Sequence, residues 1–316
     1  MAFLFLNQKI MKVLIATDKP FAQVAIDGIK DVLDKADMEL TFCEKYGEDR
    51  ERLKREISDV DAVIIRSDKI DADLMDAAKN LKIIVRAGAG YDNVDLEAAK
   101  ERNICVMNTP GQNSNAVAEL VFGLMVMVVR NFYNGTSGHE LKGLKLGIHA
   151  YGNVGRNVAR IAKGFGMEVF AFDPFCPLEV MQADGVTGLE CVEDLYEICN
   201  IVTLHIPSTR RTKKSINYSL INRMQRNSVL INTARKEIIN EIELIKLMED
   251  RPDVKYVTDL RPDAHEEFEE KFAGRYFTTP KKMGAQTAEA NINAGIAAAN
   301  QIVGFLTAGC EKFRVN

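Results

Sequence analysis

Two glycines and a carboxylate, Gly152, Gly155 and Asp173, have the types and spacing of a phosphate-binding turn followed by a ribose-binding acid. Residues 144–149 read as a strand, a helix begins near Val154, and a second strand ends at Asp173. Glycine lets the backbone approach pyrophosphate closely, and the N-terminus of a helix attracts phosphate charge. A carboxylate about 20 residues further on accepts hydrogen bonds from both ribose hydroxyls. The stretch therefore predicts a dinucleotide site, with contacts expected from Tyr151, Gly152, Asn153, Val154, Gly155, Asp173 and Pro174.

The first glycine of the usual G-x-G-x-x-G pattern is replaced here by Ala150. Alone, the remaining G-x-x-G is a weak signal, and a tight turn without a ligand is the alternative. The complete strand–turn–helix–strand unit ending in an acid favours cofactor binding. Because Asp173 would repel a 2′-phosphate and no arginine follows it directly, the predicted cofactor is NAD rather than NADP.

Along the chain, runs of β-branched residues alternate with helical patterns, which predicts parallel α/β layers that would position these residues. The pattern restarts after an apolar helix at 116–129, so we expect two α/β domains, in either a tandem or a nested arrangement. Strands are expected within 12–17, 38–43, 62–66, 81–88, 103–108, 144–152, 167–173, 201–207, 228–234 and 254–259. Further helices are expected near 21–35, 49–58, 154 onward, 191–199 and 288–306.

The composition is that of an ordinary globular protein, with 316 residues, 47% hydrophobic and 27% charged, and a formal net charge of −4. This balance indicates neither a nucleic-acid partner nor a membrane surface. Six scattered cysteines without a C-x-x-C pair indicate reduced thiols in the cytoplasm, and four histidines far apart predict no sequence-local metal site. The run 116–129 contains Glu119 and is shorter than the roughly 20 residues that cross a bilayer, so we expect it between layers or at a subunit interface. Met11 opens the first strand, which makes residues 1–10 an expected upstream extension.

Several further segments occur together and in order: RAGAGYDNVDLEAA (86–99), NTPGQNSNAVAELVFGLM (108–125), YGNVGR (151–156), LHIPST (204–209), SVLINTAR (228–235) and PKKMGAQTAEA (280–290). In this combination the chain resembles the D-2-hydroxyacid dehydrogenase family, and within it the phosphoglycerate dehydrogenases, over nearly its whole length. The resemblance implies an α/β fold of two Rossmann-like domains with parallel sheets and an interdomain cleft. The substrate-binding domain would comprise residues 1–107 plus 286–316, and the NAD-binding domain 108–285. It also implies a homodimer and a short form without a C-terminal regulatory domain, because the chain ends soon after its last helix.

Oxidation of a 2-hydroxy acid requires a cation for the carboxylate, a base for the hydroxyl proton and a nicotinamide held beside C2. By the resemblance Arg235 holds the carboxylate, since a guanidinium offers two parallel donors. The family's histidine base is absent, and Pro280-Lys281-Lys282-Met283-Gly284-Ala285 stands in its place. Counting back from Gly284 puts Lys282 at that position, whereas counting forward from Pro280 puts Lys281 there; we prefer Lys282. A lysine base needs a lowered pKa, which partial burial and the charge of Arg235 would provide; two solvated lysines in an inactive relative are the alternative.

The family's orienting glutamate is also absent, because Ala264 occupies its position. Asp263 lies one residue earlier and could pair with a lysine, although a solvated carboxylate is the more common case in so acidic a run. His265 is a weaker rival as the base. The resemblance places further cofactor contacts at His205, Pro207, Thr233, Ala234 and Asp259.

On the substrate side, Arg66 and Ser67 resemble an Arg-Ser pair that contacts substrate in phosphoglycerate dehydrogenases, with Lys69 as additional help. A phosphate needs such a cation, whereas an exposed arginine at a strand end is the alternative. The backbone amides of a glycine-rich turn are expected to receive the substrate carboxylate, and Asn108 is expected to line the cleft. The residues of that turn are Ala87, Gly88, Ala89 and Gly90.

The leading functional hypothesis is NAD-dependent oxidation of 3-phosphoglycerate to 3-phosphohydroxypyruvate, the entry to serine synthesis, with a lysine as the general base. A glyoxylate or hydroxypyruvate reductase is the alternative within the same family. An NAD-sensing binding protein with little turnover is the alternative of another class, since the histidine and glutamate are both missing.

Overall fold

The computed structural model describes residues 10–316, so the expected N-terminal extension lies outside the described residues except for Ile10. The chain forms two compact units. Unit 1 runs to Asn113 and includes Thr287–Asn316, and unit 2 is Ser114–Gln286. Residues 108–113, which the sequence-based division gave to the other domain, stay with unit 1: Asn108 Nδ2 donates to Ala89 O at 2.6 Å and Thr109 N to Gly88 O at 3.0 Å.

Unit 1 is built on a five-stranded sheet with the strand order β2-β1-β3-β4-β5, in which every pairing is parallel. Its inner strands β3 and β4 are runs of aliphatic, mostly β-branched residues that are buried up to the half-buried Arg86 at the end of β4, which is typical of a parallel sheet covered on both faces. The strands are β1 (Lys12–Thr17), β2 (Glu39–Glu44), β3 (Ala62–Ile65), β4 (Ile83–Arg86) and β5 (Cys105–Asn108).

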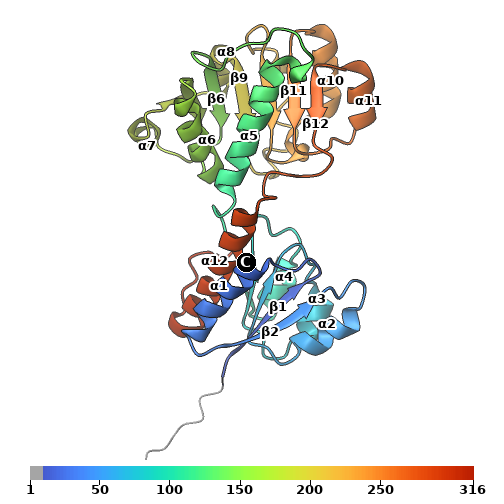
Figure 1. Cartoon of the computed structure of the whole chain (residues 1–316), viewed down its shortest axis with the longest axis vertical. Helices are drawn as coiled ribbons and strands as arrows, with labels where there is room; N and C mark the ends of the chain where they lie inside the picture. The colour runs from blue at the N-terminus through green and yellow to red at the C-terminus, as the bar shows by residue number, and fades with distance from the viewer. Residues whose placement is uncertain (1–9) are drawn as a thin grey trace, which may run out of the picture. The chain divides into compact units, whose positions relative to one another are not determined.

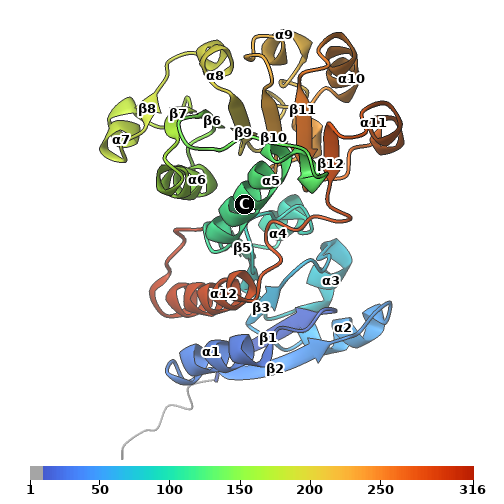
Figure 2. The ribbon, with the colours of Figure 1, turned by 45° about the horizontal axis from the view of Figure 1, so that its top comes forward.

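Helices cover both faces of this sheet. On one face α1 packs along α12, with Ala25, Ile29 and Leu33 of α1 buried at helical spacing (Figure 2). The other three helices share a second apolar cluster with the opposite face of the strands. The helices of unit 1 are α1 (Gln23–Asp34), α2 (Arg50–Ile57), α3 (Ala72–Ala77), α4 (Leu96–Glu101) and α12 (Ala288–Ala308).

Unit 2 contains a seven-stranded parallel sheet with the order β12-β11-β10-β9-β6-β7-β8. The chain leaves β6 towards β7 and later returns to pair β9 on the other side of β6, so the strand order reverses there. Ligands of open α/β sheets bind outside the carboxyl ends of the strands at such a switch point. The strands are β6 (Lys145–His149), β7 (Glu168–Phe172), β8 (Thr187–Gly188), β9 (Ile201–Leu204), β10 (Val229–Asn232), β11 (Lys255–Thr258) and β12 (Tyr276–Thr278).

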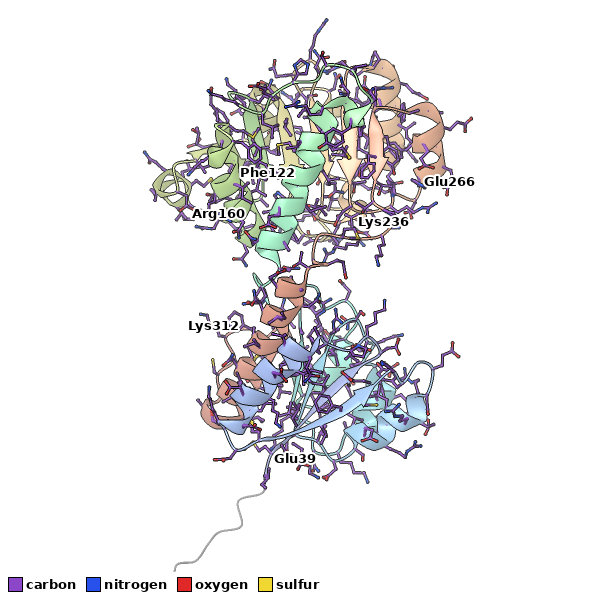
Figure 3. All side chains as sticks on the ribbon, in the orientation of Figure 1. Glu39, Phe122, Arg160, Lys236, Glu266 and Lys312 are labelled. Atoms are coloured by element: carbon purple, nitrogen blue, oxygen red, sulfur yellow. The ribbon has the colours of Figure 1, made fainter. Side chains whose placement is uncertain are left out.

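Two apolar clusters lie on the two faces of this sheet. The first contains α5, which lies across the sheet and packs beside α6 (Figure 1). Phe122 of α5, labelled in Figure 3, stacks on Phe165 with 5.0 Å between the ring centroids. The helices are α5 (Ser114–Val129), α6 (Asn153–Gly164), α7 (Leu178–Ala183), α8 (Val192–Ile198), α9 (Tyr218–Ile221), α10 (Glu241–Asp250) and α11 (His265–Lys271), with 3-10 turns η1 (Asn131–Tyr133) and η2 (Lys236–Ile238).

The predicted α/β class with parallel sheets in two Rossmann-like units is confirmed, and each expected strand and helix is present within a few residues of its predicted range. Elements without a strong apolar period were not predicted, among them β8, β12 and the short helices α3, α4, α7, α9 and α11. Within residues 10–316, no helix has both the length and the apolar character needed to span a bilayer.

Candidate active site

The predicted cofactor residues of unit 2 all follow the carboxyl ends of parallel strands, and therefore lie at one edge of the sheet. His205 and Pro207 come after β9, Thr233 to Arg235 after β10, and Asp259 after β11. The glycine turn follows β6 and Asp173 follows β7, on the two strands beside the switch point. This is the edge at which a dinucleotide binds in such folds.

The turn after β6 has the shape of a phosphate loop although its first glycine is missing. Ala150 adopts a φ of 83°, a left-handed conformation that an alanine rarely takes and a glycine takes freely. Gly155 must be a glycine, because a Cβ there would lie 2.4 Å from the oxygen of Ala150. Gly152 is the N-cap of α6 and supplies no capping side chain, which leaves the helix N-terminus suited to receive phosphate.

Asp173 is fixed by its two neighbouring loops. Its Oδ2 accepts a hydrogen bond from Tyr151 N and its Oδ1 one from Phe175 N, both at 2.8 Å. Each oxygen retains a second lone pair, so the carboxylate can still accept from ribose hydroxyls. Pro174, the residue between the two loops' contacts, is exposed.

Asp259 is buried, and its two oxygens differ. Oδ2 accepts from Gly284 N at 2.8 Å and Met283 N at 3.2 Å, while Oδ1 is buried with no hydrogen-bond partner among residues 10–316. Burial raises the pKa of Asp259, and the hydrogen bond from Gly284 and the charge of Lys282 work against that rise. Thr233 Oγ1 is a second buried atom that finds no partner in the described part of the chain. Two orphaned polar atoms at the edge where a nicotinamide amide would lie fit a bound dinucleotide.

Arg235 is half-buried and begins the 3-10 turn η2. Asn232 holds this loop, because its Oδ1 accepts from Ala234 N at 3.0 Å and its Nδ2 donates to Arg235 O at 2.9 Å. The Arg235 guanidinium also donates to Ala234 O at 2.9 Å. The buried side-chain amide of Asn232 thus fixes the loop on which Arg235 lies.

The two candidate bases, Lys281 and Lys282, are both exposed, so the partial burial expected for a lysine base is absent. Asp263 pairs with Lys236 rather than with either of them, because its loop faces η2. His265 is buried with its Nδ1 3.1 Å from Tyr276 Oη and its ring among aromatic side chains, which removes it as a rival base.

His205 is embedded beside His149, whose backbone oxygen accepts from His205 N at 2.9 Å. Burial lowers the pKa of His149 to about 4 and that of His205 to about 3, so both imidazoles are neutral at physiological pH. His149 Nδ1 lies 3.2 Å from Tyr196 Oη and His205 Nε2 lies 3.1 Å from Thr203 Oγ1. The His149 side chain is buried and that of His205 is half-buried, so both imidazoles lie against the sheet as neutral groups.

In unit 1, Arg66 and Ser67 diverge. The Arg66 guanidinium donates to Lys19 O, Pro20 O and Asn291 Oδ1 at 2.9, 3.2 and 2.7 Å, and lies 5.2 Å from the centre of the Phe21 ring. Ser67 and Lys69 instead line a crevice of about 600 Å³ within unit 1. The sequence analysis predicted that Arg66 and Ser67 contact the substrate together, but in the structure the two side chains have different neighbours.

The glycine-rich turn after β4 has fewer available amides than expected. Ala87 N continues the sheet by donating to Ile65 O, and Gly88 N donates to Arg86 O, each at 2.8 Å. Because these two backbone N–H groups already donate within unit 1, Ala87 and Gly88 cannot offer them to a substrate. The expected amide donors are then those of Ala89 and Gly90. The side chain of Asn108 steadies this turn through its bond to Ala89 O.

Arg86 is a cation that the sequence analysis did not single out. Its Nε donates to Arg66 O at 3.0 Å, and a Cβ on Gly88 would lie 1.5 Å from its Nη1. The guanidinium therefore lies over Gly88, whose φ of 150° is a conformation that favours glycine. Its position at a strand end, directly before a glycine-rich turn, is the sequence feature from which Arg86 could have been predicted as a site residue.

Comparison with known proteins places these features in one family. The model of the D-isomer-specific 2-hydroxyacid dehydrogenase catalytic domain matches residues 14–316. The D-3-phosphoglycerate dehydrogenase of Methanocaldococcus jannaschii is 35% identical over 278 residues, which cover 80% of this chain and 51% of that protein. The hydroxypyruvate reductase of Thermotoga maritima is 36% identical over 233 residues, covering 67% of this chain and 75% of that protein.

Among solved structures, the cofactor (NAD+)-bound 3-phosphoglycerate dehydrogenase of Entamoeba histolytica has a TM-score of 0.86 at 46% identity, covering 97% of this chain and 99% of that one. The apo D-lactate dehydrogenase of Escherichia coli has a TM-score of 0.76 at 22% identity, with 97% of this chain covered and 100% of that one, a likeness that shows the fold alone. The chain spans about half the length of the Methanocaldococcus relative.

Proposed function

Since this chain belongs to the D-isomer-specific 2-hydroxyacid dehydrogenase family, we propose that it is an NAD-dependent enzyme that oxidises 3-phosphoglycerate to 3-phosphohydroxypyruvate. The proposed cofactor rests on three features at the carboxyl edge of the sheet in unit 2. They are the phosphate loop after β6, Asp173 after β7, and Asp259 Oδ1 after β11, which is buried without a partner among residues 10–316. The Entamoeba relative with bound NAD+, at 46% identity, supports the same cofactor.

The chemistry divides among a few side chains. Arg235 would hold the substrate carboxylate, and Lys282 Nζ would accept the hydroxyl proton. When bound, the nicotinamide supplies the acceptor for the hydride that leaves C2. Asp259 keeps the lysine loop in place through its bonds to Met283 and Gly284, so a buried carboxylate takes over part of the orienting work of the missing glutamate. Lys281 is the alternative base and Asp263 is withdrawn from the proposal, because Lys236 occupies it.

A phosphorylated substrate is supported by the two arginines of unit 1. Three hydrogen bonds and the Phe21 ring fix the Arg66 guanidinium, whose five N–H groups outnumber the three acceptors that it contacts. Arg86 adds a second positive charge next to Arg66. Asn108 supports the turn whose Ala89 and Gly90 amides would take the substrate carboxylate.

A second candidate is the reduction of a small unphosphorylated 2-oxo acid such as hydroxypyruvate or glyoxylate. The hydroxypyruvate reductase of Thermotoga maritima, 36% identical, supports this candidate.

The assembly we propose is a cytoplasmic homodimer. Leu120, Val126 and Met127 of α5 pack against the apolar cluster of unit 2 but remain half-buried, and the area that they leave exposed suits contact with a second copy. Light scattering on the purified protein would report the mass: a dimer supports this, and a monomer at micromolar concentration contradicts it.

The decisive assay follows NADH consumption with 3-phosphohydroxypyruvate beside hydroxypyruvate, glyoxylate and pyruvate. We expect a kcat/KM preference for the phosphorylated acid that Arg66→Gln reduces by roughly 10- to 100-fold, the worth of a charge-assisted contact. Arg55→Gln, an exposed arginine on α2, is the matched control and should change nothing. Preference for an unphosphorylated acid would favour the second candidate, and NADH binding without turnover on any acid would favour a nucleotide-sensing protein.

A further inference from the structure

Asp173, the predicted ribose carboxylate, depends on two separate loops for its orientation. One oxygen accepts from Tyr151 N in the phosphate loop and the other from Phe175 N in the loop after β7, both at 2.8 Å. A displacement of either loop would therefore turn or shift the carboxylate.

A small group of side chains ties both loops together. Asp184 Oδ2 accepts from Tyr151 Oη at 3.1 Å and from Arg156 Nη1 at 3.0 Å. The Arg156 guanidinium lies 5.2 Å from the centre of the Tyr151 ring, and its Nη2 donates to Cys176 Sγ at 3.8 Å. Tyr151 belongs to the phosphate loop and Cys176 to the loop after β7, so the Arg156–Asp184 pair contacts both. We call Tyr151, Arg156 and Asp184 the Asp184 brace.

The phosphate loop has a particular need for such support. Ala150 holds a φ of 83° where the usual glycine would rest without strain. Tyr151, the next residue, is only 2% exposed, and burial together with the bond to Asp184 raises the pKa of its hydroxyl, which keeps it a donor. The brace thus acts on the residue directly after the strained one.

We propose that Asp184 is a positioning residue for Asp173: through Tyr151 and Arg156 it holds the two loops that aim the carboxylate, and so sets how strongly the site prefers NAD over NADP. The inference rests on the proposed cofactor. A carboxylate aimed at the ribose accepts from both hydroxyls and repels a 2′-phosphate, whereas a displaced one does less of each. Loss of the brace should therefore weaken NADH binding more than NADPH binding.

The test measures equilibrium binding without substrate, by titrating the purified protein with NADH and with NADPH and following nucleotide fluorescence. For Asp184→Ala we expect the Kd for NADH to rise about 5- to 10-fold, on the scale of one lost hydrogen bond, while the Kd for NADPH changes by less than about 2-fold. Asp184→Asn retains an acceptor for the tyrosine hydroxyl and loses only the ion pair, so its Kd for NADH should stay close to that of the wild type. The ion pair itself contributes little, since both side chains are about two-fifths exposed (43% and 42%).

The matched control is Glu197→Gln, which breaks an ion pair with Arg223 of similar exposure, 50% and 43%, elsewhere in unit 2. It should leave both dissociation constants unchanged. Ala150→Gly provides a second test: with the strain removed, adding Asp184→Ala should cost less NADH affinity than it does in the alanine background.

The proposal is overturned if Asp184→Ala weakens NADH and NADPH by the same factor, or changes neither, because a merely structural residue would not move their ratio. It is also overturned if the cost of Asp184→Ala is the same with alanine and glycine at position 150. Failure of the unaltered protein to bind NADH would instead refute the proposed cofactor, so the two failures are distinguishable.

Discussion

Asp259→Asn should separate activity from stability more clearly than any other single change. The carboxylate is fully buried, and its Oδ2 holds Met283 N and Gly284 N, which flank the end of the Lys282 loop. An asparagine keeps the shape and one oxygen acceptor. The substitution removes the negative charge from both hydrogen bonds and puts an NH2 group where Oδ1 is buried without a partner among residues 10–316.

The size of the effect follows from these contacts. A hydrogen bond to a charged group contributes about 1 kcal/mol more than a neutral one, so two bonds lose about 2 kcal/mol. That weakens the hold on the loop about 30-fold, and we expect kcat to fall by about that factor. The NH2 group cannot accept a hydrogen bond from the bound cofactor as Oδ1 can, and the loss of one such bond should raise the Kd for NADH by up to about 10-fold.

Stability should move little, because two contributions oppose each other. Burial raises the pKa of Asp259 above its ordinary 3.8, so its ionised form disfavours the folded state at neutral pH. Neutralisation relieves that penalty while the two hydrogen bonds weaken, and we expect Tm to change by less than about 4 °C. Since the wild-type carboxylate protonates as the pH falls through this raised pKa, wild-type turnover should decline there, and the variant should lack that limb.

Steady-state kinetics, NADH titration and thermal unfolding of both proteins test this reasoning. Asp253→Asn is the control. That carboxylate accepts from Asn227 N at 2.9 Å and pairs with Arg251 near the amino ends of β10 and β11, opposite the carboxyl ends that carry the site, so the change should lower Tm without changing kcat. Turnover within threefold of the wild type for Asp259→Asn would refute the assigned role. A large loss of Tm would show instead that Asp259 is needed for folding.

Three further outcomes are expected. Lys282→Ala should lower kcat by roughly 10²- to 10⁴-fold with NADH affinity unchanged, while Lys281→Ala retains turnover; steady-state rates with the two variants decide between the lysines. Burial lowers the pKa of His149 to about 4, so below about pH 6.5 the unfolded state binds a proton that the folded state does not. Chemical denaturation should therefore show the free energy of unfolding falling by about 3 kcal/mol between about pH 6.5 and 4. The fall should be less steep in His149→Asn. Gly155→Ala should lower the free energy of unfolding by about 1–3 kcal/mol, since its Cβ would lie 2.4 Å from Ala150 O, and a Tm equal to that of the wild type would contradict the packing argument.

The layers of the fold were predictable from sequence because the inner strands are uninterrupted buried runs. β3, AVII, is apolar along its whole length, and β10, VLIN, is apolar up to its last residue, as is typical of strands covered on both faces. β12 has three residues, and its sequence YFT gives no period, so its place at the sheet edge depends on tertiary contacts. The division of the chain near residue 108 was missed by a few residues because the bond between Asn108 and Ala89 joins segments that no local pattern connects.

The candidate site divides in the same way. The turn from Gly152 to Gly155 and the acid at Asp173 have a fixed spacing, because one βαβ unit carries them all. The partners of Arg66 have no such fixed spacing. Asn291 lies 225 residues away in sequence and contacts the guanidinium only after α12 packs onto the sheet. The use of the Ala87 amide by the ladder between β3 and β4 was equally invisible, because strand register is a property of the folded sheet.

The choice between Lys281 and Lys282 shows how a structural contact sharpens a motif. The sequence offered two ways of counting, from Pro280 or from Gly284. Gly284 N itself donates to Asp259 Oδ2 at 2.8 Å. At the other end, the hydrogen bond to the strand edge comes from Thr279 N to Thr258 O at 3.2 Å and not from Pro280, which has no N–H. The charge of Lys282 also acts to lower the pKa of Asp259, against the larger effect of burial. Counting back from Gly284, whose own amide contacts Asp259, therefore keeps Lys282 as the proposed base.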